Sequence, residues 1–404
     1  MEWKEVRLGD VCTRVCSGGT PKSTNLSYYG GEIPWLNTKE IDFNRIYSTE
    51  KTITDSGLNN SSAKWIVPNT VTVAMYGATA GKSCIVKVPM TTNQACCNLT
   101  INDEVADYEF VYYTLKNDYT TLASLANGGA QQNLNAQIIK DYVLQMPSLA
   151  DQRRIASILS SLDSKIELNN KINADLEKMA QAIFKNWFVD FEPFKDGEFV
   201  DSELGMIPEG WKVGRLDEIA DVVGGSTPSK AKPEYYTQKG IAWLTPKDLS
   251  NHPAVYSSRG EIDITEEGYN STSTKLMPKG TILFTSRAPI GYISIAQNDI
   301  CTNQGFKSLV PKKAGTCFLY CFLKYVTPEI ENKSTGSTFK EASGALMKSL
   351  QVIMPDQKVF EEFEEIVSPL FARIESLEKE NSRLSLLRDT LLPRLMSGEL
   401  EVPE

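Results

Sequence analysis

The sequence is poor in the side chains on which most catalytic and metal sites depend. It has one histidine, His252, in 404 residues. No acidic residue flanks it, so histidine-based acid–base chemistry is not expected. The eight cysteines include two Cys-x3-Cys pairs and one adjacent pair, but none has a second pair at zinc-finger spacing. We therefore predict buried, reduced cysteines and no metal site.

Other absences narrow the class of protein. No run of about 18 apolar residues is present, which excludes a membrane-spanning helix. The first residues, MEWKE, lack an apolar signal region, so we expect a cytoplasmic protein. The Asn-Pro-Pro-aromatic or Asp-Pro-Pro-aromatic tetrad of amino-methyltransferases is missing, and no nuclease carboxylate cluster ending in x-Lys is evident. These absences favour a binding module over an enzyme.

A surplus of basic residues is also lacking. The net charge is −9, of which −6 falls within residues 356–404, whereas residues 1–147 and 201–355 are close to neutral. An acidic chain can still carry a local basic face, so nucleic acid is not excluded as a ligand. The balance does predict weak binding by this chain alone, with a partner supplying phosphate contacts.

What the sequence does contain is an internal repeat. Residues 3–42 and 211–250 share, in order, a Trp-Lys pair, a Gly-rich turn ending in Thr-Pro, a Tyr-Tyr pair and an Ile-x-Trp-Leu run. The offset between the copies is 208 at Trp3 and Trp211 and stays within two residues of that value at later matches. Two copies of one domain predict pseudo-twofold symmetry, which suits duplex DNA as a ligand.

Each copy divides into a globular part and a long helix. The globular part has short β-like runs broken by Gly, Pro and Asn and then a helical stretch, which predicts a compact α+β domain of mostly strand character. A capping signal at Ser148 and Asp151 opens the first long helix. The expected segments are a first domain at 1–147, a central spacer helix at 148–190, a linker at 191–210, a second domain at 211–355, and a C-terminal spacer helix and tail at 356–404.

Both helices carry a seven-residue apolar repeat, which is typical of a coiled coil. The predicted seam consists of Ile155, Leu159, Leu162, Ile166, Asn169, Asn173, Leu176 and Ile183 in the first helix and Phe363, Val367, Leu370, Ile374, Leu377, Asn381, Leu384 and Leu391 in the second. Buried asparagines in such a seam fix the register. Pro393 is expected to end or kink the second helix near Leu392 and to leave Leu395 outside the coil.

The asparagines allow two pairings. A parallel register opposes Asn173 to Asn381, and an antiparallel one opposes Asn169 to Asn381. Because the termini of a domain usually lie close together, the chain path favours the antiparallel arrangement, with one globular domain at each end. At about 1.5 Å per residue, the first helix is a rod of roughly 50 Å. Such a rod predicts a split DNA target whose halves lie about one to one and a half turns apart.

Several polar residues are candidates for DNA contacts. The run at residues 77–83 is one residue too short for a phosphate-binding loop, so we interpret it as a tight turn. Thr-Asn-Gln recurs at residues 92–94 and 302–304. Such amides can read adenine, but recurrence in two domains that read different sequences favours a structural role. The candidates are Lys22, Lys39, Lys82, Gln94, Gln131, Gln132, Lys230, Lys232, Lys247, Arg287, Gln304 and Lys340.

Three longer strings resemble one known family. Residues 183–193 (IFKNWFVDFEP), 204–212 (LGMIPEGWK) and 391–400 (LLPRLMSGEL) are similar to motifs of type I restriction–modification specificity subunits, and the order of domain, helix, domain and helix agrees over the whole chain. The crowded Phe184, Trp187 and Phe188 suit either a domain junction or a partner surface.

The resemblance implies a non-catalytic DNA-binding subunit whose two recognition domains each read half of a bipartite target. It further implies that the helices act as a ruler and dock two methyltransferase subunits, and that a restriction and translocase subunit joins them. S-adenosylmethionine, ATP and Mg would be bound by those partners, with no cofactor in this chain. The alternative is a scaffold module that assembles protein partners through its coiled coil without reading DNA.

Overall fold

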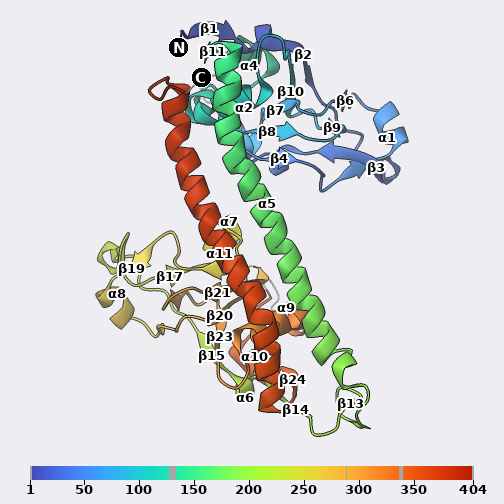
Figure 1. The fold of residues 1–404 in the computed structure, drawn as a ribbon, viewed down its shortest axis with the longest axis vertical. Helices are drawn as coiled ribbons and strands as arrows, with labels where there is room; N and C mark the ends of the chain where they lie inside the picture. Colours follow the sequence, from blue (N-terminus) through green and yellow to red (C-terminus); the bar gives the residue numbers. More distant parts are fainter. Residues whose placement is uncertain (1, 127–132, 288, 336–339, 403–404) are drawn as a thin grey trace. The chain divides into compact units, whose positions relative to one another are not determined.

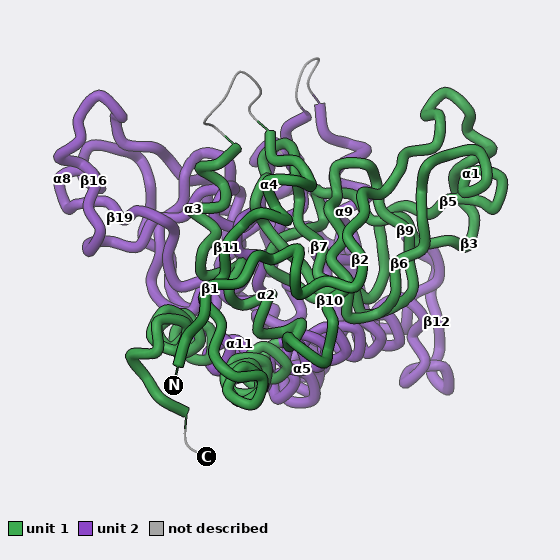
Figure 2. Tube along the Cα trace, turned by 90° about the horizontal axis from the view of Figure 1, so that it is seen from above, with its two compact units in different colours: residues 1–166, 383–404 green, residues 167–382 purple. Residues whose placement is uncertain are grey.

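The computed structural model describes residues 2–126, 133–287, 289–335 and 340–402. The chain forms two compact units (Figure 2), one of residues 1–166 with 383–404 and one of residues 167–382. The unit boundaries fall inside the long helices, so each unit contains one globular domain and a part of both helices. The expected limits of the domains at 147 and 355 remain a prediction.

The first unit is built from eleven strands and four short α-helices within its described residues (Figure 1). They are β1 Lys4–Arg7, β2 Cys12–Ser17, β3 Tyr29–Leu36, β4 Arg45–Ile46, β5 Thr52–Ile53, β6 Trp65–Ile66, β7 Val71–Ala74, β8 Ser83–Val86, β9 Met90–Thr92, β10 Cys96–Ile101, β11 Val143–Met146, α1 Asp55–Asn59, α2 Tyr108–Asn117, α3 Tyr119–Ser124 and α4 Ala136–Asp141. The 3-10 turns η1 Leu8–Val11, η2 Leu26–Tyr28, η3 Thr38–Glu40 and η4 Gly77–Thr79 connect some of them.

The second unit repeats this plan after a linker that holds the 3-10 turn η5 Glu192–Phe194 and the hairpin of β12 Phe199–Val200 and β13 Ile207–Pro208. Its elements are β14 Lys212–Arg215, β15 Ala220–Gly224, β16 Tyr236–Thr237, β17 Trp243–Leu244, β18 Tyr256–Ser257, β19 Asp263–Ile264, β20 Ile282–Ser286, β21 Ile290–Ala296, β22 Cys301–Thr302, β23 Lys307–Pro311, β24 Gln351–Met354, α6 Leu216–Ile219, α7 Pro246–Asn251, α8 Glu266–Asn270, α9 Thr316–Lys333, α10 Gly344–Ser349 and the 3-10 turn η6 Pro233–Tyr235.

The sheet topology shows that the two globular parts share one fold. The five-stranded sheet has the order β2-β10-β7-β8-β4 in the first unit and β15-β23-β20-β21-β18 in the second. The parallel pair β3 and β9 aligns Trp35 with Thr91, and its counterpart, β17 and β22, aligns Trp243 with Cys301. The predicted repeat and the α+β class are confirmed.

The central strands are buried on both faces of this sheet. In β7, Val71 and Val73 pack with α2 on one face, whereas Ala74 packs on the other face with Leu36 and Met90 from β3 and β9. Side chains alternate between faces along a strand, which explains why every residue of this run is buried. None of the helices in the described part of the chain has an apolar stretch that could span a lipid bilayer.

The long helices α5 Leu149–Phe188 and α11 Gln357–Met396 run antiparallel within each unit. In the first unit, Asp163 accepts a hydrogen bond of 2.6 Å from Arg388. In the second, the amide of Asn169 donates to Asn381 at 2.9 Å, and the Phe184 and Phe363 rings lie 6.3 Å apart. Residue numbers rise along one helix as they fall along the other, so the antiparallel prediction is confirmed.

A layer of polar side chains sets the register of the helices in the second unit. Asn169 is fully buried and donates to Asn381 and to Glu380, and Asn381 donates to Asn170 at 2.7 Å. Because a shift by one residue would leave the buried amide of Asn169 without these partners, the layer opposes slippage.

The expected end of the helix near Leu392 is wrong. Helix α11 continues through Pro393 to Met396, and Leu395 is 3% exposed, in one core with Ile155 and Leu159 of the first unit. A proline inside a helix costs about 3 kcal/mol. The last turn also buries Leu392 and Met396, and each buried side chain of this size contributes about 1.5–3 kcal/mol. Tertiary burial therefore outweighs the local penalty.

Candidate nucleic-acid interface

The repeated Gly-rich turn packs directly against the repeated Thr-Asn-Gln turn. The Gly19 N–H donates to the Thr92 carbonyl at 2.9 Å in the first unit, and the Ser226 N–H donates to the Thr302 carbonyl at 3.0 Å in the second. A Cβ atom added to Gly18 would lie 2.1 Å from the Thr92 carbonyl oxygen, and one added to Gly225 would lie 2.2 Å from that of Thr302. The backbones approach so closely that a side chain would collide with them.

This contact predicts a position-specific effect of adding a methyl group. We expect Gly225→Ala to lower the free energy of unfolding of the second unit by about 1–3 kcal/mol, because the turn must move away from Thr302. Gly224 is the matched control, since a Cβ there meets no atom within 4 Å. Urea titrations of both variants compare the two effects, and equal midpoints would contradict the packing argument.

The same turn holds an aromatic pair in place in each unit. The Trp35 indole donates to the Gly19 carbonyl at 2.9 Å, and the Trp243 indole donates to the Ser226 carbonyl at 3.1 Å. The Tyr29 hydroxyl donates to Pro21 at 2.7 Å. Tyr236 makes the equivalent bond to Pro228 at 2.6 Å. These bonds give the repeated Tyr and Trp positions a structural role that sequence reasoning missed, although their recurrence was the signal.

The recurring asparagine and glutamine have different tasks. Asn93 accepts from the Ala95 N–H at 3.0 Å and Asn303 from the Gly305 N–H at 2.8 Å, so both asparagines build the turn, the structural role that recurrence favours. Gln94 and Gln304 are exposed.

Each glutamine is paired with the threonine of the neighbouring turn: the Thr20 hydroxyl donates to Gln94, and that of Thr227 donates to Gln304. Bidentate reading of adenine uses both ends of an amide. While the pair holds, the threonine hydroxyl occupies one acceptor site of the amide oxygen, and the amide nitrogen makes no part of that bond.

In the second unit three predicted contact residues line one cavity. Lys230, Lys247 and Gln304 surround an open hollow of about 840 Å³, with Trp243 and Tyr236 among the other lining residues. Lys247 lies 3.4 Å from Glu261 across its rim and remains exposed. The two lysines and the amide are the groups that suit a polyanion in this hollow, whose lining also contains the acids Asp248 and Glu261.

The remaining candidates of this unit lie on neighbouring segments. Arg287 follows β20 next to the glutamine turn, because the Ser286 N–H donates to the Gly305 carbonyl at 2.7 Å. Its guanidinium is 3.7 Å from Glu341. Lys340 donates to the Glu331 carbonyl at 3.2 Å. Lys232 donates to the Tyr235 hydroxyl at 2.8 Å and covers that ring, so it is the most constrained of the exposed lysines on this turn.

The first unit brings its candidates to one edge. Lys39 follows β3 and Gln94 follows the parallel strand β9, and Leu36 is paired with Thr92 at their ends. Lys22, on the Gly-rich turn, and Lys39 are exposed. Lys82 differs, since it is only 26% exposed and lies 2.5 Å from Asp42. Gln131 and Gln132 lie outside the described residues.

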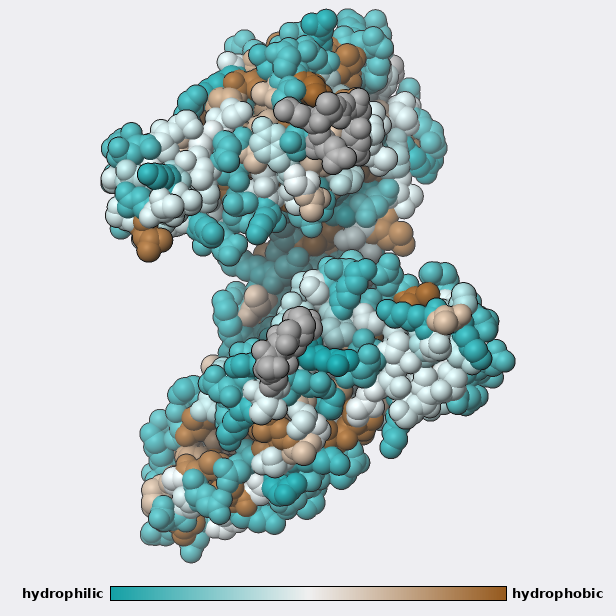
Figure 3. Space-filling model, turned by 180° about the vertical axis from the view of Figure 1, so that it is seen from behind, coloured by the Kyte–Doolittle hydropathy of each residue, from teal (hydrophilic) through white to brown (hydrophobic). Residues whose placement is uncertain are grey.

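The run at residues 77–83 begins with the short 3-10 turn η4 and ends at the first residue of β8, in agreement with the tight turn interpreted from its spacing. Its Thr79 hydroxyl donates to the Thr38 carbonyl at 2.9 Å, so the turn supports η3 and Lys39. In the view of Figure 3, residues of hydrophilic or intermediate hydropathy cover most of the drawn face, and hydrophobic residues form small separate groups. Such a face suits a polar ligand.

Cysteine and acidic side chains do not form a metal centre in the part of the chain that the structure describes, where no group of three or more potential ligands occurs. Burial raises the pKa of Cys301 to about 11 and that of Cys12 to about 12. These thiols are therefore protonated at neutral pH and poor ligands or nucleophiles.

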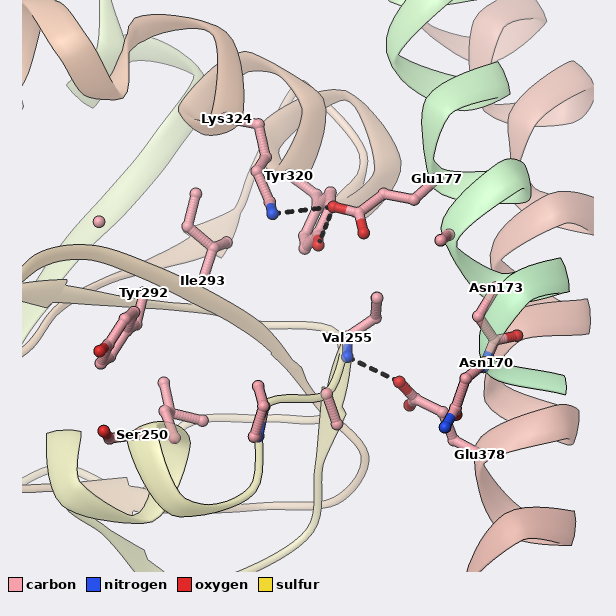
Figure 4. A pocket seen from close by; sticks show the side chains of 15 residues that line it. Asn170, Asn173, Glu177, Ser250, Val255, Tyr292, Ile293, Tyr320, Lys324 and Glu378 are labelled. Carbon is pink, nitrogen blue, oxygen red and sulfur yellow. Dashed lines mark hydrogen bonds and ion pairs between the residues drawn. The ribbon is translucent and has the colours of Figure 1, made fainter. Parts of the chain in front are cut away.

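Two glutamates attach the second domain to the helices. Glu378 of α11 accepts from the Val255 N–H at 2.7 Å and from the Tyr256 N–H at 3.0 Å, at the start of β18. Glu177 of α5 accepts from the Tyr320 hydroxyl and lies 2.8 Å from Lys324. Figure 4 shows both carboxylates reaching from the helices across a pocket of about 540 Å³.

The carboxyl of Glu378 predicts a pH effect. Burial raises its pKa from 4.5 to about 7; the bonds from Val255 and Tyr256 lower the pKa, and the nearby Glu177 and Glu375 raise it. The folded chain then binds more protons than the unfolded chain between about pH 4.5 and 7. The contribution of this group to stability is therefore full below that range and is lost as the pH rises through it. We expect the unfolding midpoint of the natural chain to fall relative to that of Glu378→Gln between about pH 5 and 8. Parallel pH profiles would rule the effect out.

Comparison with known proteins places both copies in one family. The model for the type I restriction modification DNA specificity domain matches residues 1–178 and again residues 208–386. The chain is 32% identical over 416 residues to the type I restriction enzyme MjaIX specificity subunit of Methanocaldococcus jannaschii, and the alignment covers 100% of this chain and 94% of that protein. The HindI specificity subunit of Haemophilus influenzae is 26% identical over 357 residues, 72% of this chain and 77% of that protein.

A solved structure shares the fold. The S subunit of a type I restriction-modification system from M. genitalium superposes with a TM-score of 0.60 at 19% identity, covering 98% of this chain and 96% of that one.

Proposed function

This chain belongs to the family of type I restriction–modification DNA specificity subunits, and we propose that it selects the DNA target of such a complex. Each recognition domain reads one half of a bipartite site, and the long helices set the distance between the halves. The observation that carries the proposal is the match of both copies to a DNA specificity domain, on two globular parts with the same strand order.

The contact surfaces support different half-sites. Both units keep the aromatic pair and the threonine–glutamine pair, but the residues around them differ. The Thr-Pro turn is followed by Lys22 in the first unit and by Ser229 and Lys230 in the second. A shared scaffold with different side chains at its rim allows two domains to bind DNA alike and to read different bases.

The partners follow from the same proposal. Two methyltransferase subunits dock on the helices and methylate adenine with S-adenosylmethionine, and a restriction and translocase subunit uses ATP and Mg. This chain is then non-catalytic and acts in the cytoplasm, where its DNA lies. The acidic segment 356–404 suits protein docking better than phosphate contact.

Mapping the methylated adenines of the host genome tests this proposal. Deleting the gene is expected to abolish adenine methylation at one split motif, and replacing residues 1–147 by another recognition domain is expected to change only one half of it. An unchanged methylome would leave the scaffold alternative, in which the helices assemble partners without reading DNA. A change in both halves would contradict the assignment of one domain to one half-site.

The two cavity lysines give a quantitative prediction. If Lys230 and Lys247 contact phosphates, each alanine variant loses affinity for every DNA sequence about equally and lowers the slope of log K against log salt by about 1. Fluorescence anisotropy of the chain with its methyltransferase partner, at several salt concentrations, measures both. Lys358→Ala, on an exposed face of α11, is the control. An altered methylated motif in Lys247→Ala would instead indicate a base contact.

A further inference from the structure

The equivalent helices α2 and α9 begin with different residues. Asp107 precedes α2, and its carboxylate accepts from the Phe110 N–H at 2.9 Å. Gly315 precedes α9 at the same position of the repeat, 208 residues later, and has no side chain to offer. Its backbone is extended, with φ at −79°, so glycine is not required there by conformation.

The missing acceptor of α9 comes from the long helix α11. One oxygen of Glu364 accepts from the Phe318 N–H at 2.8 Å, and the other accepts from the Cys317 N–H at 3.3 Å. The first N–H groups of a helix have no partner within it, and a carboxylate there also meets the positive end of the helix dipole. Glu364, on the long helix α11, therefore caps α9, a helix of the second globular domain.

In each unit, one of the two equivalent positions carries the capping carboxylate and the other has a small residue. A Cβ atom added to Gly315 would lie 2.1 Å from the Glu364 carboxyl carbon. On α5 the position 208 residues before Glu364 is Ala156, which is 2% exposed. The Asp107 N–H donates to Gln152 of α5 at 3.0 Å, one turn before Ala156, so we expect a glutamate at position 156 to come close to the Asp107 carboxylate. The acidic cap thus lies on the domain in the first unit and on the long helix in the second.

We propose that these positions form a matched pair that fixes each recognition domain on its own helix, Asp107 with Ala156 and Gly315 with Glu364. Glu364 is then a positioning residue for the second domain. A recombinant that joins the second domain to the first helix would pair glycine with alanine and leave the helix uncapped. The opposite recombinant would press two carboxylates together. The pairing itself does not rest on the proposed function. Only the experiment that measures DNA methylation rests on it.

A double-mutant cycle on the full chain tests the pair. We expect Glu364→Ala to lower the thermal midpoint of the second unit by about 2–4 °C, and to speed hydrogen exchange of the Cys317 and Phe318 amides about tenfold. Gly315→Asp alone is expected to lower the midpoint further, because Asp meets Glu364. The double variant G315D/E364A recreates the first unit's arrangement and is expected to recover most of both losses. Additive losses in the double variant would overturn the proposal.

The first unit provides the mirror experiment. Ala156→Glu is expected to lower the midpoint, and Asp107→Gly combined with it is expected to restore it. If G315D fails to fold, the Ala156→Glu and Asp107→Gly cycle and the hydrogen-exchange rates of Glu364→Ala still test the proposed pair. Exchange at residues 317 and 318 that does not change in Glu364→Ala would overturn the role of Glu364.

A positioning role has one readout that loss of stability does not share. In complex with its methyltransferase, the natural chain is expected to methylate sites of one spacer length. Glu364→Ala is expected to accept spacers one base pair longer or shorter, with both half-sites unchanged, and G315D/E364A to restore the single length. A uniform loss of methylation without new spacers would reduce Glu364 to a stabilising contact. Absence of site-specific methylation in the natural complex would contradict the proposed function and leave the capping pair intact.

Discussion

Replacing Asp163 with alanine is expected to lower the free energy of unfolding of the first unit by about 3–5 kcal/mol, the usual cost of removing one partner from a buried ion pair. Its carboxylate accepts from Arg388 at 2.6 Å and from the Tyr113 hydroxyl at 2.6 Å, and lies 4.0 Å from Arg45. The side chains of Asp163, Arg388 and Arg45 are 10%, 16% and 4% exposed. Without Asp163, Arg45 and Arg388 lose the carboxylate that they share in a site that water hardly reaches.

The other half of the chain suggests the control. At the positions equivalent to Asp163, Arg388 and Tyr113 the second copy has Phe371, Ala180 and Cys321, all buried in one apolar core. The triple variant D163F/R388A/Y113F imitates that apolar junction while Arg45 keeps Glu109 at 3.2 Å. We expect it to recover at least half of the loss, because apolar groups that replace a whole ionic cluster are often neutral.

Urea unfolding followed by hydrogen exchange in residues 108–117 measures the effect on the first unit. A loss below about 1 kcal/mol in Asp163→Ala would show that water solvates the site and that the ion pair behaves like a surface pair.

The second large effect is expected at Phe188. The centre of its ring lies 4.9 Å from that of Phe318, 5.1 Å from that of Phe363 and 6.0 Å from that of Trp211. It therefore joins α5, α9, α11 and the residue that precedes β14. It is 4% exposed. Phe188→Ala should lower the free energy of unfolding of the second unit by about 3–5 kcal/mol, because the side chain is lost and a cavity remains among rigid rings.

Leu204→Ala is the matched control for Phe188→Ala, because Leu204 is 45% exposed in the linker of the same unit. It is expected to change stability by less than about 0.5 kcal/mol. Guanidinium titrations of the two variants and the natural chain provide the comparison. A midpoint for Phe188→Ala that matches the control would indicate that neighbouring rings close the cavity.

The burial of Phe188 and of Phe184 also decides between two interpretations of the aromatic cluster. Both serve the junction between the helices and the second domain, since they are 4% and 2% exposed. Trp187 is half-buried in the same cluster. The composition of residues 184–188 could not make this choice, because a docking surface and a domain junction are equally rich in aromatic side chains.

By itself the sequence left the choice between parallel and antiparallel helices to an argument from the domain termini, because its asparagines allow both. It determined the duplicated α+β fold and the two long helices. These features follow from periodicity and from similarity between distant segments, which are written along the chain and need no coordinates. The family could be identified from three short strings for the same reason.

Only the tertiary structure decided the outcome where a local sequence signal and contacts between distant residues oppose each other. It carried α11 through Pro393, because the side chains of Leu392, Leu395 and Met396 around the expected break are buried. It placed an acidic residue, Asp163, at the contact between the long helices, where Arg45, Tyr113 and Arg388 are its partners. It also placed the cap of α9 on another helix, at Glu364. Each result depends on energies between residues far apart in the chain, and such energies leave no periodic or local pattern to read.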